Sequence, residues 1–103
     1  MKEIVDLNCD MGEGFGQWTL GEAPDEEIMA LISSANIAAG FHAGDPLTIQ
    51  NTITLAKQHK VTIGAHVSYP DIQGFGRRSM VLEQAELIAI IHAQLALLEG
   101  MAR

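Results

Sequence analysis

The stretch Asn36-Ile37-Ala38-Ala39-Gly40-Phe41-His42-Ala43-Gly44-Asp45-Pro46 decides the fold. Its first half is a short apolar run that predicts the core of a strand, and glycines follow where the backbone must turn. Asp45 before Pro46 is typical of a helix N-cap followed by proline at the first helical position. His42 is therefore expected at the carboxyl end of a strand. In parallel α/β folds, ligands bind at that edge of the sheet.

The same order of strand and helix recurs on both sides of this stretch. Strands are predicted at 3–9, 33–40 and 61–66, and helices at 24–32, 46–59 and 83–99, with Gly100 ending the last helix. The helix between the second and third strands is long enough for the crossover that parallel strands require. The sequence therefore predicts an α/β fold in which residues 1–103 form a single unit of three βα repeats with parallel strands.

Three βα repeats make an incomplete sheet. The edges of so small a parallel sheet would stay exposed, and the last helix should lead into a fourth strand that residues 1–103 do not contain. We therefore expect these residues to be the N-terminal part of a larger (β/α) barrel, or to be completed by another chain.

Composition and charge restrict the classes of partner. Of 103 residues, 48% are hydrophobic, and 13 acidic against 6 basic residues give a net charge of -7. This composition is typical of one soluble globular domain, and its negative charge disfavours nucleic acid and anionic membranes as general partners. No apolar run approaches the roughly 18 residues of a membrane span. A single cysteine and an N-terminus without a signal-peptide core predict a cytoplasmic location.

Carboxylates and histidines follow the ends of all three predicted strands. Asp10 and Glu13 follow the first strand, His42 follows the second, and His66 ends the third. Each residue alone is more often a loop side chain satisfied by backbone hydrogen bonds, but the set suits a divalent cation or general acid–base chemistry. The spacing is not that of a HExxH site or a zinc finger, so the sequence leaves the metal open.

Glycines and arginines are candidate anion-binding groups. Residues 12–16 read Gly-Glu-Gly-Phe-Gly, and backbone N–H groups in such a loop can bind phosphate, although an ordinary loop explains the sequence equally well. Arg77 and Arg78 are adjacent and follow Gly74-Phe75-Gly76 in a predicted loop. They would bind a carboxylate or phosphate bidentately, or else remain solvated and balance the acidic edge. Of two adjacent side chains such as these arginines, usually only one points toward the interior of a site.

The remaining reactive and aromatic side chains are interpreted as structural. Cys9 lies at a strand end, where an inert thiol is commoner than a nucleophile. A substrate-facing ring is the less common interpretation for the loop aromatics. The residues interpreted as loop packing or as structural histidines on helices are Phe15, Trp18, Tyr69, His59 and His92.

Three segments together resemble the LamB/YcsF family. They read DLNCDMGEGFG at 6–16, SANIAAGFHAGDP at 34–46 and GAHVSYPDIQGFGRR at 64–78. The resemblance implies a (β/α) barrel of the glycoside hydrolase/deacetylase type, on the scale of ~250 residues usual for such barrels. The chain would be the N-terminal portion of that barrel, and the family continues into a further histidine-containing segment.

This family includes the A subunit of the bacterial ATP-dependent 5-oxoprolinase. The resemblance therefore implies an ATP-hydrolysing enzyme that converts 5-oxoproline, with ATP and water, into L-glutamate, ADP and phosphate. The implied partners are subunits B and C, and the implied cofactors are ATP with Mg²⁺ and a divalent metal at the strand-end edge.

The resemblance also implies roles for the candidate residues. Asp10 and Glu13 would hold a cation or activate water, and His42 and His66 would stabilise developing charge or ligate the cation. The metal ligands expected on this basis are Asp10, His42 and His66. Substrate or phosphate would be bound by Gly12, Gly14, Asp45, Arg77 and Arg78.

Two alternatives stay open. The first is a metal-dependent amide or carbohydrate deacetylase, which bound zinc and turnover without ATP would identify. The second is a non-catalytic docking fragment of a larger complex, which would dock other subunits through its exposed sheet edge and helix faces. Self-association or poor solubility of the isolated chain, without substrate binding, would favour it.

Overall fold

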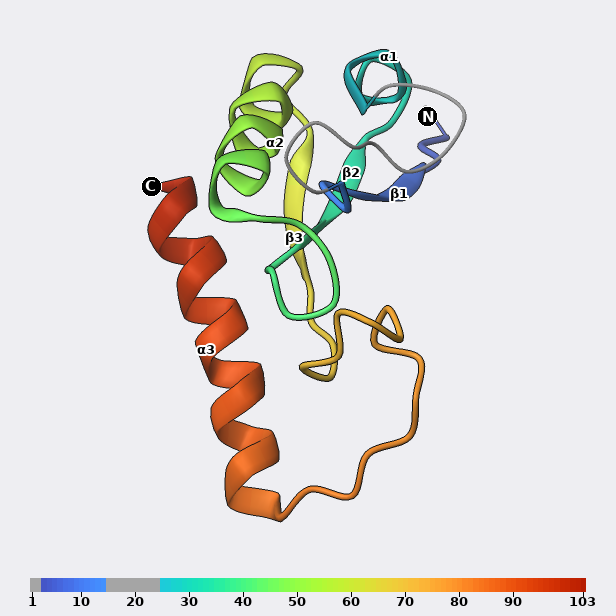
Figure 1. Cartoon of the computed structure of the whole chain (residues 1–103). Helices are drawn as coiled ribbons and strands as arrows, with labels where there is room; N and C mark the ends of the chain where they lie inside the picture. Colours follow the sequence, from blue (N-terminus) through green and yellow to red (C-terminus); the bar gives the residue numbers. More distant parts are fainter. Residues whose placement is uncertain (1–2, 15–24) are drawn as a thin grey trace.

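The computed structural model describes residues 3–14 and 25–103 (Figure 1). Three parallel strands form one sheet in the order β1-β2-β3, with bounds Asn8–Met11, Ser34–Ala38 and Thr62–His66. The helices are α1 (Asp25–Met29), α2 (Pro46–Gln58) and α3 (Gln84–Ala102). Strands and helices alternate along the chain and the strands pair in parallel, as the sequence predicts. The α/β class and its βα repeats are therefore confirmed.

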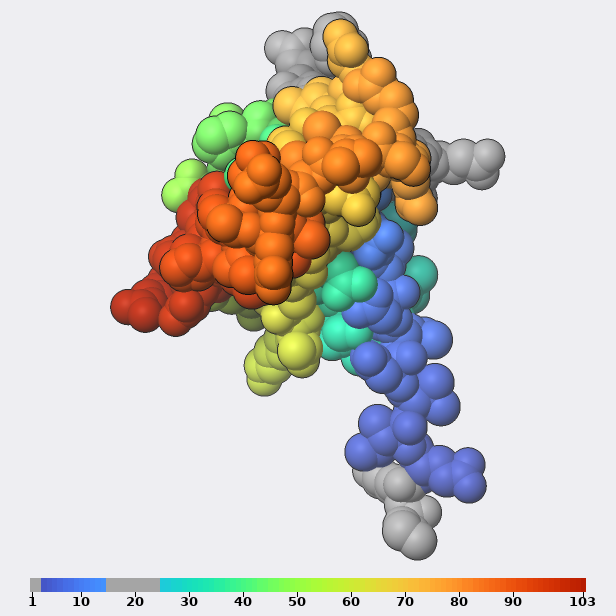
Figure 2. All heavy atoms as spheres, turned by 90° about the horizontal axis from the view of Figure 1, so that it is seen from below, coloured from blue at the N-terminus to red at the C-terminus, as the bar shows by residue number. Residues whose placement is uncertain are grey.

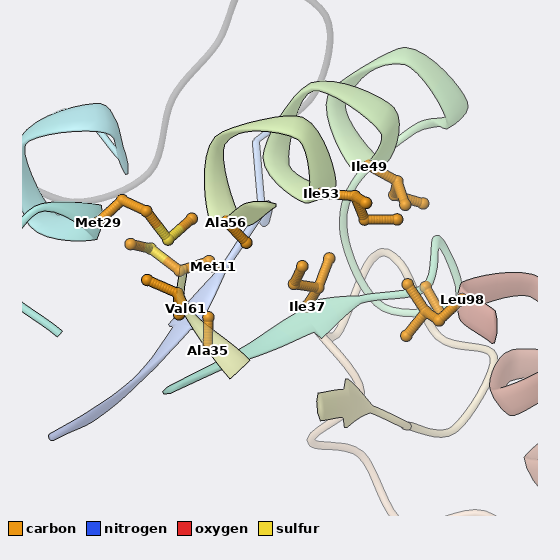
Figure 3. Close-up of a cluster of buried hydrophobic side chains, with 10 residues drawn as sticks. Met11, Met29, Ala35, Ile37, Ile49, Ile53, Ala56, Val61 and Leu98 are labelled. Carbon is orange, nitrogen blue, oxygen red and sulfur yellow. The ribbon is translucent and has the colours of Figure 1, made fainter. Parts of the chain in front are cut away.

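The core lies between the sheet and its helices. Side chains of a strand alternate between two faces, and one face of this sheet is apolar. Figure 3 shows apolar side chains from the strands meeting α2, with Met29 of α1 at one side and Leu98 of α3 at the other. Full burial of a Val, Ile, Leu or Met side chain stabilises the fold by roughly 1.5–3 kcal/mol. The buried core residues are Met11, Met29, Ala35, Ile37, Ala39, Ile49, Ile53, Ala56, Val61 and Leu98.

The opposite face of the sheet carries a row of hydrogen-bonded polar side chains. Asn8 pairs in register with Ser34, and Asp10 with Asn36. Asn8 donates to the hydroxyl of Ser34 at 2.8 Å, while Nδ2 of Asn36 donates to Asn8 at 2.7 Å and to Asp10 at 3.2 Å. This row links neighbouring strands and ends at Asp10, close to the carboxyl edge.

Strand β1 begins later than predicted. The predicted strand spans 3–9, but Ile4 and Val5 are 91% and 75% exposed and lie outside the sheet. Figure 2 shows this N-terminal segment, in blue, projecting from the body of the molecule. Pairing starts at Asn8 because its partner strand starts at Ser34. The apolar residues before Asn8 have no facing strand, so their composition alone does not make a strand.

The N-terminus of α2 follows the prediction. Asp45 is the N-cap, and its carboxylate accepts from the N–H of Thr48 at 2.9 Å and from the Thr48 hydroxyl at 2.8 Å. Pro46 occupies the first turn, where its missing N–H costs no hydrogen bond. The predicted bounds of 46–59 differ from the observed helix by one residue at its end.

Two predicted helix ends are wrong. Helix α1 ends at Met29 rather than at residue 32, because Leu31 already donates to Ile28 in a tighter turn; Pro24 lies outside the described residues. Helix α3 continues through Gly100 to Ala102. Gly100 does not adopt the positive φ that ends a helix, and a glycine inside a helix costs only about 1 kcal/mol relative to alanine.

Helix α3 lies to one side of the sheet (Figure 1), and its buried residues are Gln94 and Leu98. It has 19 residues with a mean hydropathy of 1.4, and 11% of it is buried. By length and composition it is therefore apolar enough to cross a membrane, and the expectation that no segment approaches a membrane span is wrong. Core helices of soluble proteins meet the same criteria, so this property alone does not assign α3 to a membrane.

Candidate active site

A tight turn between β2 and α2 positions His42. The N–H of Gly40 donates to the carbonyl of Ala43 at 3.0 Å, and Gly40 and Gly44 have φ values of 86° and 85°. A side chain at Gly44 would begin 2.7 Å from the carbonyl oxygen of Gly12, which follows β1. Glycine is therefore required where this turn meets the end of β1, and the contact brings His42 beside the residues after β1.

Glu13, His42 and His66 converge at the carboxyl edge of the sheet. Oε2 of Glu13 lies 2.8 Å from Nε2 of His42 and 3.6 Å from Nδ1 of His66. The two imidazole rings are 4.4 Å apart between centroids and inclined by 55°. His42 is buried, whereas Glu13 and His66 are partly accessible. The edge thus holds one carboxylate between two imidazoles.

Both histidines keep a buried nitrogen that has no hydrogen-bond partner among residues 3–14 and 25–103. These atoms are Nδ1 of His42 and Nδ1 of His66. A buried polar atom without a partner costs about 1–3 kcal/mol, so such atoms are usually reserved for a ligand or a further polar group. Imidazole nitrogen and carboxylate oxygen are the donors that zinc and similar divalent ions prefer.

The cluster fits a divalent cation. One ligand atom from each of Glu13, His42 and His66 lies within 4.8 Å of the others. Two ligands at about 2.1 Å from one ion are at most about 4.2 Å apart, so a small side-chain rotation closes the set. The residues that would hold the ion are therefore Glu13, His42 and His66.

Asp10 lies at the margin of this cluster. Its Oδ1 is 3.8 Å from Nδ1 of His66 and accepts from Asn36, and its side chain is nearly half exposed. The structure thus places all four predicted catalytic residues at one end of the sheet. Of the predicted metal ligands, His42 and His66 form the cluster with Glu13, and Asp10 lies beside it.

A pocket of about 350 Å³ opens next to the two histidines. Its polar side carries His42, His66, Ser68 and Arg77, and its apolar side is formed by α3. The ring of Phe75 packs nearly perpendicular to that of His42, with ring centroids 5.0 Å apart. The pocket suits a small molecule with one charged and one apolar side. The remaining lining residues are Val67, Tyr69, Phe75, Gly76, Leu87, Ile90 and Ile91.

The two adjacent arginines have different surroundings. Arg77 lines the pocket beside the histidines. Arg78 binds the buried carboxylate of Asp71, with Nε 3.0 Å from Oδ2 and with Nη2 also donating to Oδ1. The side-chain hydrogen bonds from Arg78 lower the pKa of Asp71 to about 2. Arg77 is therefore the arginine available to a ligand in this pocket.

The other predicted ligand-binding residues are engaged in the structure of the loops. Gly12 has a φ of 71° and donates its N–H to Asp25 at 3.0 Å. Gly14 is half-buried next to Glu13, and Asp45 caps α2. The rest of the predicted phosphate loop, together with Phe15 and Trp18, lies outside the described residues.

The described side chains interpreted as structural are Cys9, His59, His92 and Tyr69. Burial and then the acidic neighbours Asp10, Asp25 and Glu13 raise the pKa of Cys9, and a protonated thiol is a weak nucleophile. His59 and His92 are exposed and do not line the pocket. Tyr69, interpreted as loop packing, instead lines the pocket.

Sequence reasoning missed two buried polar residues next to the site. One is Asp71, described above. The other is Gln94 of α3, which accepts from the N–H of Ser68 at 2.9 Å and donates to the carbonyl of Ser68 at 2.8 Å. A glutamine inside an apolar helix stripe, four residues from Ile90 and from Leu98, is the signal that would have revealed it.

Comparison with known proteins identifies the family. Residues 5–103 match the LamB/YcsF family. The chain is 58% identical over 98 residues to a 5-oxoprolinase A subunit, the one numbered 1, of Pseudomonas syringae pv. tomato, covering 95% of this chain and 38% of that protein. It is 54% identical over 100 residues to the 5-oxoprolinase A subunit of Vibrio cholerae serotype O1, covering 97% of this chain and 40% of the relative.

A solved structure agrees with these relatives. The crystal structure of the lactam utilization protein from Thermus thermophilus matches 94% of this chain with a TM-score of 0.87 and 46% identity, and the match covers 38% of that protein. The chain thus spans about two fifths of the length of the relatives that it matches. The family match, the sequence identities and the shared fold agree, and the chain belongs to the LamB/YcsF family.

Proposed function

We propose that this chain supplies the N-terminal strand ends of a 5-oxoprolinase active site, as part of the A subunit, which works with subunits B and C in the cytoplasm. The observation that carries the proposal is the Glu13–His42–His66 cluster, whose histidines line a pocket that also holds Arg77. The names of the relatives support the substrate class. The three βα repeats would form the beginning of a (β/α) barrel of the glycoside hydrolase/deacetylase type.

The chemistry explains why ATP is needed. The amide carbon of a five-membered lactam is a poor electrophile, and transfer of the γ-phosphoryl group from Mg-ATP to the amide oxygen activates it. Water then adds to this carbon, the C–N bond breaks, and the ring nitrogen takes up a proton. A second water removes phosphate from the resulting acyl phosphate. The products are L-glutamate, ADP and phosphate.

The cluster provides groups for the water addition. Glu13 is held by His42 at 2.8 Å, so its carboxylate is oriented to accept a proton from an attacking water. His66, 3.6 Å from Glu13, stabilises charge that develops beside it. A divalent ion held by Glu13, His42 and His66 would supply Lewis-acid polarisation of an oxygen ligand, and Glu13 would then act as a metal ligand in place of accepting the proton. Asp10, with Oδ1 3.8 Å from Nδ1 of His66, adds negative charge at the margin of the cluster.

The pocket provides groups for binding. 5-Oxoproline has a carboxylate at one side and methylene groups at the other. Arg77 binds the carboxylate, and the α3 wall of Leu87, Ile90 and Ile91 packs on the methylene edge. The polar and apolar sides of the pocket therefore set one orientation of the ring, with its amide toward the histidines.

The donor set also favours a second candidate, a metal-dependent amide or carbohydrate deacetylase. Two imidazoles and a carboxylate are a common ligand set of hydrolytic zinc. The two candidates differ in their need for ATP. Glutamate formation from labelled 5-oxoproline, measured with both partner subunits and with or without Mg-ATP, separates them. Glutamate formed only with ATP, together with ADP, supports the oxoprolinase. Zinc-dependent deacetylation without ATP supports the deacetylase and contradicts the oxoprolinase.

A further inference from the structure

One buried carboxylate organises the loop that follows β3. Asp71 is 6% exposed. Its N–H donates to the carbonyl of Phe41 at 3.0 Å, which ties the loop to the turn that carries His42. Its carbonyl accepts from the N–H of Gly76 at 2.8 Å, and its Oδ1 accepts from the N–H of Gly74 at 3.0 Å. The backbone and side chain of Asp71 thus hold both sides of segment 71–78.

Arg78, at the end of this segment, binds the carboxylate of Asp71 at its beginning. Its Nε lies 3.1 Å from Oδ1 and 3.0 Å from Oδ2 of Asp71, and Nη2 donates to Oδ1. The Asp71 side chain is 3% exposed, whereas the Arg78 side chain is 62% exposed. The buried carboxylate of Asp71 is therefore held in place by its surroundings, and the exposed guanidinium of Arg78 binds to it. Only a planar guanidinium provides two parallel donors to it, so lysine would not reproduce the contact.

The enclosed residues adopt a backbone that needs support. Phe75 has a φ of 55°, a left-handed conformation that is unusual for a bulky residue, and Gly76 has a φ of 72°. A side chain at Gly76 would collide with the hydroxyl of Ser68 and approach Cβ of His42 to 3.0 Å. This conformation places the ring of Phe75 nearly perpendicular to that of His42, at an interplanar angle of 78°. Such a conformation persists only when its surroundings hold it.

We propose that Asp71 is a positioning residue of the candidate site. By binding Arg78 and the backbone of segment 71–78, it leaves Arg77 facing the pocket and holds Phe75 against His42. Asp71 itself lines a separate surface depression with Phe41 and Arg78, not the pocket of the histidines. It therefore acts through Arg77 and Phe75. The identity of the bound anion as a carboxylate rests on the proposed function, whereas the positioning geometry does not.

The test is Asp71→Asn in the full chain, with two readouts. The imidazole resonances of His42 in NMR spectra report the nearby ring of Phe75, and calorimetric titration with 5-oxoproline reports Arg77. We expect the His42 resonances to shift and the dissociation constant to rise about tenfold, while circular dichroism stays unchanged. Glu99→Gln is the matched control, because it breaks an exposed ion pair with Arg103 at the far end of α3. It should change neither readout.

Arg78→Lys keeps the charge but removes the parallel donors, and its exposed position makes it tolerant of change. If Asp71→Asn does not fold, Arg78→Lys tests the positioning role instead. We expect its His42 resonances and its dissociation constant for 5-oxoproline to change in the same direction. A folded Asp71→Asn with wild-type His42 resonances overturns the proposal, as does an unaffected Arg78→Lys if Asp71→Asn is unfolded. If the wild-type chain does not bind 5-oxoproline, the proposed substrate is wrong, and the His42 resonances alone still decide the positioning role.

Discussion

Glu13 and His42 form a hydrogen bond of 2.8 Å across 29 residues of sequence, joining the ends of two neighbouring strands. The contact is possible because parallel strands present their carboxyl ends at one edge. His66 from the third strand completes the group. The register places Ala38 beside His66, so the three strand ends lie in one row.

Glu13 should be essential for metal binding. Glu13→Gln keeps the size of the side chain and removes its charge, so we expect the affinity for Co²⁺ to fall at least about tenfold. Asp10→Asn should have a smaller effect, because Asp10 stands outside the three-residue cluster. Visible absorption of bound Co²⁺ measures both. A larger loss in Asp10→Asn than in Glu13→Gln would show that Asp10 is the ligand.

His66 should be needed for turnover and dispensable for folding. His66→Ala removes a group within 3.6 Å of Glu13 while leaving the core intact, and loss of such a group lowers turnover about 10²- to 10⁴-fold. His92→Ala is the matched control, because His92 is exposed on α3. Steady-state assays with thermal unfolding of each variant give the comparison. Retained activity in His66→Ala would contradict its assignment.

Arg77 should bind the substrate carboxylate. Arg77→Met removes the charge beside the pocket, and we expect KM for 5-oxoproline to rise about tenfold or more with a smaller change in kcat. Because Asp71 and Phe75 keep their contacts, the His42 resonances should stay in place. This combination distinguishes Arg77→Met from Arg78→Lys. An unchanged KM would mean that the carboxylate is bound elsewhere.

Asp71 should make the fold sensitive to acid. Its pKa is lowered to about 2 in the folded chain by the hydrogen bonds from Arg78. A carboxyl whose folded pKa lies below its unfolded pKa contributes stability above the unfolded value, and this contribution disappears as the pH falls from about 4 to about 2. Urea unfolding over this range should show a weaker pH dependence in Asp71→Asn than in the wild type.

The comparison must be made between proteins at each pH. Hydrogen bonds from Ser33 and Ser34 also lower the pKa of Asp6, which therefore contributes in the same direction. Asp6 is unchanged in the variant, so the difference between the two proteins isolates Asp71. Equal pH dependence in wild type and Asp71→Asn would show that the Arg78 contact does not stabilise the fold.

Local signals were sufficient to predict the repeat and the row of residues at its edge. The N-cap at Asp45, the glycines around His42 and the apolar run of β2 are all read within a few residues, and they place His42 and His66 after consecutive strands. A crossover helix then requires those strands to be parallel. The presence of polar side chains at the carboxyl edge of the sheet could therefore be predicted without any knowledge of long-range contacts.

Other features depend on contacts between distant residues. The start of β1 is set by its partner at Ser34, not by the apolar residues before Asn8. The different roles of Arg77 and Arg78 depend on the burial of Asp71 under the turn at Phe41. The polar contacts of Gln94 appear only when α3 packs beside Ser68. A local pattern can single out a residue such as Gln94 but does not specify its partner, so the sequence left the two arginines equivalent.

The most direct test of the account is ADP and glutamate formation from 5-oxoproline by the protein at its encoded length, assembled with both partner subunits and Mg-ATP. Wild type and Glu13→Gln are compared, with Glu99→Gln as the control. We predict one ADP per glutamate in the wild type and the control, and at least about a hundredfold slower glutamate formation in Glu13→Gln. Wild-type turnover by a folded Glu13→Gln protein, or none by the wild type, would contradict the account.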